Sequence, residues 1–338
     1  MKRIFFLMLI LILILSLLGC GGEKEPEQLS PPAEVEPALE TPAPEAEPAV
    51  VGTILNPLTG EMVERTITLL AVMINNAPQA RPQTGLAAAD LVYEIEMEGN
   101  ITRFVAFYHG DPPENVGPVR SARPYVMMLA KEWDAYFAHV GGSDDAFAKV
   151  KEWGIKDIDD VRGHPGFWLD SSRKRPHNTY LNLEKALSGK KESGNLSRWE
   201  FQEPTPILPD YEKISLSYDK SNRPSYHFHR EEGLYLRYIN DKPHQDRETG
   251  EQIKVRNVII QYAVHQSLQN KHGHIDVRLT GEGKAEYFLG GKHFTGSWHK
   301  KDLNSPTVFL DEEGKAIQPV QGKTWIQVVR KGKEPILE

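Results

Sequence analysis

The first part of the chain is organised around the stretch Gly117-Pro118-Val119-Arg120-Ser121-Ala122-Arg123. It follows the apolar run Phe104-Val105-Ala106-Phe107-Tyr108, which predicts a buried strand. It precedes Pro124-Tyr125-Val126-Met127-Met128-Leu129-Ala130, which predicts a helix with proline in its first turn. If the helix begins at or before Arg120, Arg120 and Arg123 lie on one face of it. Arginines at a helix N-terminus suit a phosphate or carboxylate, so we expect an anion site here.

Strands and helices alternate around this stretch. Apolar strands are predicted over 66–73, 91–97, 102–108 and 135–140, with the acids of Leu91-Val92-Tyr93-Glu94-Ile95-Glu96-Met97 on one face. Helices are predicted over 124–132, 146–153 and 183–187. This alternation predicts that residues 51–198 form an N-terminal α/β sandwich domain with a mixed sheet.

Short strands and glycine-rich turns dominate the end of the chain. The strongest is Asn257-Val258-Ile259-Ile260-Gln261-Tyr262-Ala263-Val264, and Gly290-Gly291 predicts a hairpin turn. We therefore expect a β-rich C-terminal domain over 225–338, joined to the first by a linker at 199–224 that contains several prolines. The predicted fold class is α+β, or mixed.

The chain begins with an export signal. Lys2 and Arg3 precede an apolar run that ends in Leu17-Leu18-Gly19-Cys20, and Cys20 is the one cysteine of the chain. The run is too short for a comfortable transmembrane helix and has the length of a signal-peptide core. It resembles the lipobox of bacterial lipoproteins, which implies a signal peptide over 1–19 and a diacylglyceryl group on Cys20. The alternative is an uncleaved signal anchor.

Residues 20–50 are rich in proline, glutamate and alanine, a composition that predicts a disordered stalk. The formal net charge is −7, and loss of Lys2 and Arg3 makes the mature chain more negative still. We therefore expect a protein held on the extracytoplasmic face of the cell membrane by its lipid, and no nucleic-acid partner.

Several sequence blocks carry a family resemblance. They are Arg81-Pro82-Gln83-Thr84-Gly85-Leu86, Ala89-Asp90-Leu91-Val92-Tyr93-Glu94, Thr102-Arg103-Phe104, Gly117 to Arg123, Gly141-Gly142-Ser143 and Pro176-His177-Asn178. Together they resemble the YerB-type lipoproteins, a family with an N-terminal and a C-terminal domain of unknown function. The resemblance spans nearly the whole mature chain and implies architecture and location, with no assigned catalytic residue.

Polar side chains follow the buried strands of the first domain, where ligands of open α/β sheets commonly bind. The candidate anion-binding residues are Arg81, Arg103, Arg120, Arg123, Arg175, His177 and Asn178. Arginine holds phosphate and carboxylate oxygens in two-pronged contacts. The acids Glu94, Glu96 and Glu98 offer the alternative of a purely structural ion-pair network. We expect an envelope protein that binds an anionic ligand or a protein partner.

An enzyme is the competing prediction. The arrangement of arginines after buried strands is similar to that of LytR-CpsA-Psr phosphotransferases. That similarity implies that Arg103, Arg120 and Arg123 hold a pyrophosphate and that Asp90 holds Mg²⁺. No Gly-x-Ser-x-Gly elbow accompanies Ser121 or Ser143, and no zinc-enzyme motif accompanies the paired histidines, so we expect no metal or other cofactor in a binding protein.

Overall fold

The computed structural model describes residues 54–194 and 199–338. The predicted signal peptide, Cys20 and the whole of the predicted stalk lie outside the described residues, as do residues 51–53 and 195–198. Within the part of the chain that is described, no helix has the length and apolar character needed to cross a membrane.

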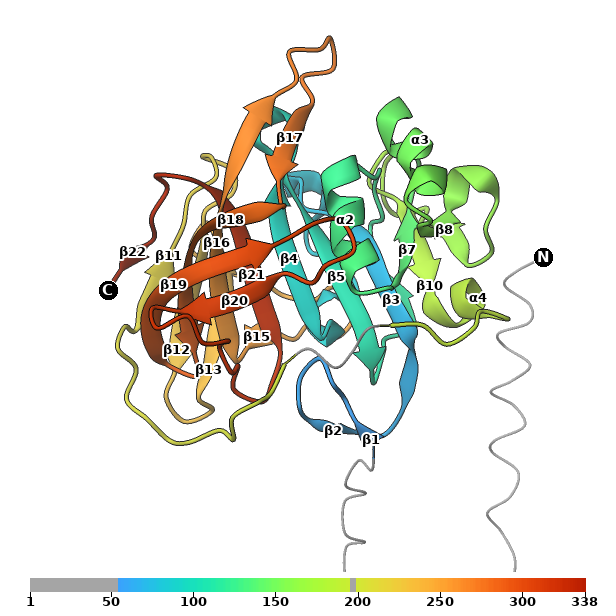
Figure 1. The fold of residues 1–338 in the computed structure, drawn as a ribbon. Coiled ribbons are helices and arrows are strands. Elements are labelled where there is room, and N and C mark those ends of the chain that lie inside the picture. Colours follow the sequence, from blue (N-terminus) through green and yellow to red (C-terminus); the bar gives the residue numbers. More distant parts are fainter. Residues whose placement is uncertain (1–53, 195–198) are drawn as a thin grey trace, which may run out of the picture. The chain divides into compact units, whose positions relative to one another are not determined.

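A sheet of eleven strands forms the centre of the body (Figure 1). Its order is β20-β19-β18-β16-β21-β4-β5-β3-β7-β8, and β17 pairs with β16 outside this path. The strands are β3 (Thr66–Asn75), β4 (Leu91–Glu96), β5 (Thr102–Gly110), β7 (Tyr136–His139), β8 (Lys156–Asp159), β16 (Asn257–Ser267), β17 (Ile275–Arg278), β18 (Gly281–Leu289), β19 (Lys292–Lys300), β20 (Val308–Asp311) and β21 (Thr324–Arg330).

The two predicted domains, residues 51–198 and 225–338, both contribute strands to this one sheet. Strand β21 pairs in parallel with β4 on one side and with β16 on the other, so strands from 51–198 and from 225–338 are direct neighbours. Strands predominate over helices in the described residues, which makes the fold mixed but mostly β. The predicted strands at 66–73, 102–108 and 257–264 are confirmed, each extended by a few residues.

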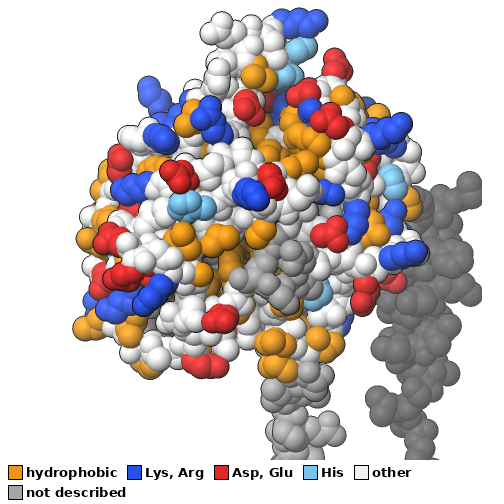
Figure 2. Space-filling view, viewed as in Figure 1, with side chains coloured by type: hydrophobic (Ala, Val, Ile, Leu, Met, Phe, Trp, Pro, Cys, Tyr) orange, Lys and Arg blue, Asp and Glu red, His pale blue; other side chains and the backbone are white. Residues whose placement is uncertain are grey.

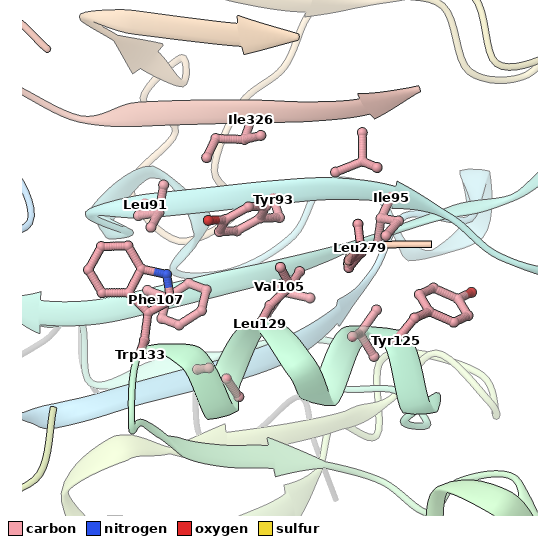
Figure 3. Packing of buried hydrophobic residues seen from close by; sticks show 14 of the residues in the cluster. Leu91, Tyr93, Ile95, Val105, Phe107, Tyr125, Leu129, Trp133, Leu279 and Ile326 are labelled. Atoms are coloured by element: carbon pink, nitrogen blue, oxygen red, sulfur yellow. The ribbon is translucent and has the colours of Figure 1, made fainter. Parts of the chain in front are cut away.

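Both faces of the sheet are covered, and the apolar side chains of β4 point alternately to the two faces. Leu91, Tyr93 and Ile95 face one core, and Val92 belongs to the other. On the first face, α2 (Pro124–Glu132) packs its apolar residues against the sheet. Figure 3 shows this packing, with Leu129 and Trp133 directed toward the side chains of β4 and β5.

Two smaller sheets cover the second face with apolar residues of the other core. The larger has the order β14-β13-β12-β11-β22, with β15 paired to β13, and the smaller has the order β6-β10-β9. Their strands are β11 (Lys213–Ser215), β12 (Pro224–His229), β13 (Leu234–Ile239), β14 (Lys242–Pro243), β15 (Lys254–Val255), β22 (Ile336–Leu337), β6 (Asn115–Val116), β9 (Phe167–Leu169) and β10 (Thr179–Asn182). A short pair, β1 (Ile54–Leu55) and β2 (Met62–Val63), stands apart.

The predicted helices are confirmed in α2, α3 (Asp144–Glu152) and α4 (Leu183–Leu187). The Ser143 hydroxyl caps α3 by accepting a hydrogen bond from the Ala146 backbone N–H at 3.2 Å. Four 3₁₀ turns complete the regular structure: η1 (Pro78–Ala80), η2 (Leu86–Ala88), η3 (Glu98–Asn100) and η4 (Asp160–Arg162).

Helix α2 begins at Pro124, so Arg120 and Arg123 do not share a helical face. Arg123 is the N-cap and is extended, with φ −136° and ψ 152°. The residue before a proline is driven out of the helical region by contact with the proline ring. The condition for a shared face, a helix beginning at or before Arg120, is therefore not met.

A buried ion pair joins the two larger sheets. The Arg237 guanidinium of β13 donates to the Glu94 carboxylate of β4 at 2.6 Å, and both side chains are 0% exposed. Asn76, Asn222 and Gln327 each donate an amide N–H to the same carboxylate, at 3.1, 2.8 and 3.0 Å. The arginine places a charge opposite the acid, and these partners keep the pKa of Glu94 below its usual value in spite of burial.

We expect Glu94→Gln to lower the free energy of unfolding by about 3–5 kcal/mol, because it leaves the Arg237 charge buried without a counter-ion. Chemical denaturation of residues 50–338 measures the change. The matched control is Glu212→Gln, which removes the partner of Arg230 in an exposed pair and should change stability by less than about 1 kcal/mol. Similar small losses in both variants would contradict a central role for the buried pair.

We also expect a pH dependence from His244, which is buried beside Arg237 and donates from Nε2 to the Gln83 side chain at 2.8 Å. Burial and then the charges of Arg237 and Arg81 hold its pKa well below the usual value. The unfolded chain takes up a proton below about pH 6.5 and the folded chain does not, so stability is lost as pH falls.

The expected loss is about 1.4 kcal/mol for each pH unit below 6.5. Denaturation midpoints between pH 7 and pH 5 measure it, and comparison with His244→Gln separates it from the titration of Asp90, whose pKa of about 6 lies in the same range. In His244→Gln this part of the pH dependence should disappear. Parallel curves for the two proteins would rule out His244 as its source.

Candidate functional site

The segment of the two arginines lies beside a cavity of about 340 Å³. Its walls come from this segment, from the end of β7, from η4 and β9, and from the chain that enters β10. The lining residues are Val119, Arg120, Val140, Asp160, Phe167, Trp168, Leu169, Arg175, Pro176, Asn178 and Thr179. The cavity thus combines apolar walls with a few polar groups, the usual composition of a small-molecule site.

The backbone around Arg120 is fixed by hydrogen bonds to strands β3 and β10 and to the residue after β7. The Arg120 N–H donates to the Met73 carbonyl of β3 at 2.8 Å, and the Arg120 carbonyl accepts from the Val140 N–H at 3.0 Å. The Val119 N–H donates to the Thr179 carbonyl of β10 at 2.7 Å. Gly117 permits this approach, since a Cβ there would lie 2.7 Å from the Tyr180 ring.

The Arg120 side chain is only partly satisfied. Its Nη1 donates to the Pro176 carbonyl at 3.3 Å, and its buried Nε has no hydrogen-bond partner among the described residues. No carboxylate of the described residues lies within ion-pair distance of Arg120, and burial lowers the pKa of its guanidinium. Arg175, which lines the same cavity, is exposed. The guanidinium groups of Arg120 and Arg175 therefore border the cavity, and neither forms an ion pair with a carboxylate of the described residues.

One acid shares the cavity with these arginines. Asp160 of η4 lines it, and burial together with the neighbouring Asp159 charge raises the Asp160 pKa. Asp159 itself is buried and accepts the Gly141 N–H at 2.8 Å and the Val161 N–H at 3.2 Å, which holds the loop after β7 against η4. Two arginines, Arg120 and Arg175, and one carboxylate, Asp160, line the cavity, so the formal charge of its walls is positive.

Arg103 and Arg123 lie away from this cavity and are paired. Arg103 Nη2 and Arg123 Nε lie 3.2 Å from the two oxygens of the Glu98 carboxylate, and Arg123 Nη2 contacts it as well. Both arginines also donate to backbone carbonyls, of Ser121 and Ala122 respectively. Burial lowers the pKa of Arg103 to about 10. Arg103 and Arg123 therefore belong to a structural ion-pair network with Glu98, the alternative to an anion site that the sequence left open.

The remaining predicted residues divide between structure and cavity. Arg81 donates to the Asn76 side chain and backbone and to the Ser221 carbonyl at 2.8–2.9 Å, which engages its whole guanidinium. His177 Nδ1 accepts from the Asn75 amide at 2.7 Å, and burial with the charges of Arg120 and Arg173 lowers its pKa. Asn178 is buried and lines the cavity. Of the seven candidates, Arg120, Arg175 and Asn178 come together there.

Asp90, the metal ligand implied by the phosphotransferase similarity, is not beside the arginines. It immediately precedes β4, whereas Arg103 pairs with Ile95 near the other end of that strand. Its carboxylate accepts from the His109 and Gly110 N–H groups and from Asn56, and burial raises its pKa to about 6. Nowhere in 54–194 or 199–338 do three His, Cys, Asp or Glu residues gather as a metal site.

Sequence reasoning missed the apolar walls of the cavity. No strand is predicted from the sequence at Phe167, Trp168 and Leu169, but they form β9 and pair with β10. The available signal was the run of three large apolar residues itself. In the structure Trp168 is 42% and Leu169 53% exposed, unusual for apolar residues beside a charged loop.

Comparisons with known proteins give a consistent relationship. Residues 58–196 match the family described as "Protein of unknown function (DUF3048) N-terminal domain", and residues 214–326 match the corresponding C-terminal domain. The "Putative lipoprotein YerB" of Bacillus subtilis (strain 168) is 33% identical over 302 residues, covering 84% of this chain and 89% of that protein. The crystal structure of YerB protein from Bacillus subtilis matches with a TM-score of 0.76 at 31% identity, covering 85% of this chain and all of that chain. The predicted YerB-type resemblance is thereby confirmed, and the chain belongs to the DUF3048 family.

Proposed function

We propose that this protein is a lipoprotein held on the extracytoplasmic face of the membrane through Cys20, and that its body binds an anionic ligand of the cell envelope. The leader sequence before Cys20 supports the anchor. The Bacillus subtilis relative is named "Putative lipoprotein YerB", which also supports the anchor.

The observation that carries the binding proposal is the state of Arg120. A guanidinium group that is half-buried beside a cavity normally has a carboxylate or several carbonyl partners, because its desolvation is otherwise unfavourable. Arg120 has one long hydrogen bond to Pro176 and a buried Nε without a partner among the described residues. An anion in the cavity would give the Arg120 guanidinium the charged partner that it lacks among the described residues.

The charge distribution of the molecule favours a local site over a broad electrostatic field. On the face that Figure 2 shows, basic and acidic side chains are interspersed, and neither sign forms a large continuous area. The chain as a whole is net negative. Selectivity for an anion would therefore come from the two cavity arginines and the Asn178 side chain, at short range.

The scaffold alternative accounts for Arg103 and Arg123, whose shared partner is Glu98. It does not account for Arg120 or Arg175, which have no such partner in the described residues. The phosphotransferase alternative needs an acid and arginines at one place, and the position of Asp90 gives it no support. Binding without turnover is the function that these positions favour.

We expect pyrophosphate to stabilise residues 50–338 against thermal unfolding, by roughly 2.7 kcal/mol at a concentration a hundredfold above its dissociation constant. The double variant Arg120→Ala, Arg175→Ala should lose this stabilisation, because the site loses both guanidinium groups. Differential scanning calorimetry with and without the ligand measures both effects.

Two controls separate binding from folding. Lys174→Ala removes one exposed positive charge from the same loop without touching the cavity, and should retain the ligand effect. Arg123→Ala should lower the stability of the unliganded protein, because it breaks the contact with Glu98, and also retain the ligand effect. Stabilisation that persists in the Arg120, Arg175 double variant would place the anion elsewhere.

A further inference from the structure

We infer that the ligand of this cavity is an anionic amphiphile, a lipid phosphate whose charged group meets Arg120 and Arg175 while its hydrocarbon lies along Phe167 and Leu169. This inference rests on the proposed anion site and names its ligand class. A lipid phosphate and a free phosphate share the anionic group, and only the lipid phosphate carries an apolar chain.

The cavity walls are the first ground for this inference. Away from the arginines, Asp160, Asn178 and Thr179 are the polar residues of the lining, and the apolar part is formed by Val119, Val140, Phe167, Leu169 and Pro176. A site for a compact, strongly hydrated phosphate would gain from further N–H and hydroxyl donors at these positions. Apolar walls instead favour a ligand that brings hydrocarbon next to its charge.

An exposed apolar side chain at the rim of the cavity is the second ground. Leu169 belongs to the cavity wall and is 53% exposed, so water surrounds much of this large side chain in the unliganded protein. A hydrocarbon chain leaving the cavity past Leu169 would cover it, whereas a free phosphate would leave it in water.

Strand β9 holds this rim in place. Successive side chains of a strand point to opposite faces, so Phe167 and Leu169 share one face and Trp168 takes the other. The Trp168 ring stacks on Tyr180 with 5.0 Å between centroids, and its Nε1 donates to the Asn115 side chain at 3.0 Å. The apolar wall is thus fixed from behind before a ligand arrives, which limits the entropy lost on binding.

Isothermal titration of residues 50–338, the compact unit that follows residue 49, tests the inference with three monomeric probes. Glycerol 3-phosphate carries the anion alone. Dihexanoyl phosphatidic acid, below its micelle concentration, carries the anion and two chains. Dihexanoyl phosphatidylcholine carries the chains without net charge. We expect phosphatidic acid to bind at least tenfold more tightly than either of the other probes.

Two variants assign the contacts. Leu169→Ser should weaken phosphatidic acid several-fold and leave glycerol 3-phosphate unchanged, whereas Arg120→Ala should weaken both. The matched control is Leu208→Ser, at a leucine that is 69% exposed and does not line the cavity; it should change neither.

Each other outcome has a defined meaning. Equal affinity for glycerol 3-phosphate and phosphatidic acid overturns the lipid inference and leaves the anion site standing. Binding of neither phosphate overturns the anion site itself. Phosphatidic acid that binds equally to the Leu169→Ser, Arg120→Ala and unaltered proteins occupies another surface, which also overturns the inference.

Discussion

The buried pair of Glu94 and Arg237 is the constraint on which the rest of the structure depends. These residues are 143 positions apart in the chain, and each is fully buried by the sheet that carries the other. A buried charge is strongly destabilising without its counter-ion, so the pair fixes how the two sheets pack against each other. The same constraint explains why the two segments form a single body. Separating them would leave Glu94 on one side and Arg237 on the other, each with its charge buried or newly hydrated and unpaired.

The supply of carboxylates decides which arginines remain free. Glu94 pairs with Arg237, Glu96 with Arg330, and Glu98 with both Arg103 and Arg123. The three acids of one strand and its turn thus pair with four arginines, and none lies within ion-pair distance of Arg120. The local backbone accounts for this difference, because Pro124 keeps Arg123 extended and ends the segment before the helix. Arg123 can then turn back to Glu98, while Arg120 is directed to the cavity at Pro176.

How far the sequence could predict this arrangement depends on the range of the interactions. The bounds of α2 and the Ser143 cap follow from residues within one turn, and sequence patterns predict them well. The pairing of Arg237 with Glu94 could not be predicted, since the period of β13 says which side chains share a face and nothing about a partner 143 positions away. Strand β9 was missed for another reason. It has three residues between Gly166 and Asp170, too few for a period to be recognised.

At the candidate site, the backbone of Arg120 is held by hydrogen bonds while its side chain has no carboxylate partner among the described residues. Both backbone groups of Arg120 are bonded to β3 and to the residue after β7, so its Cα cannot shift without breaking two strand ends. Its guanidinium makes one long hydrogen bond to Pro176, and its buried Nε has no partner among the described residues. A group that only stabilised the fold would be expected to use its donors internally, as Arg81 and Arg123 do. Arg120 instead combines a fixed backbone with a guanidinium that has no carboxylate partner among the described residues. Both properties favour binding, because a fixed backbone limits the entropy lost and an anion supplies the charge partner.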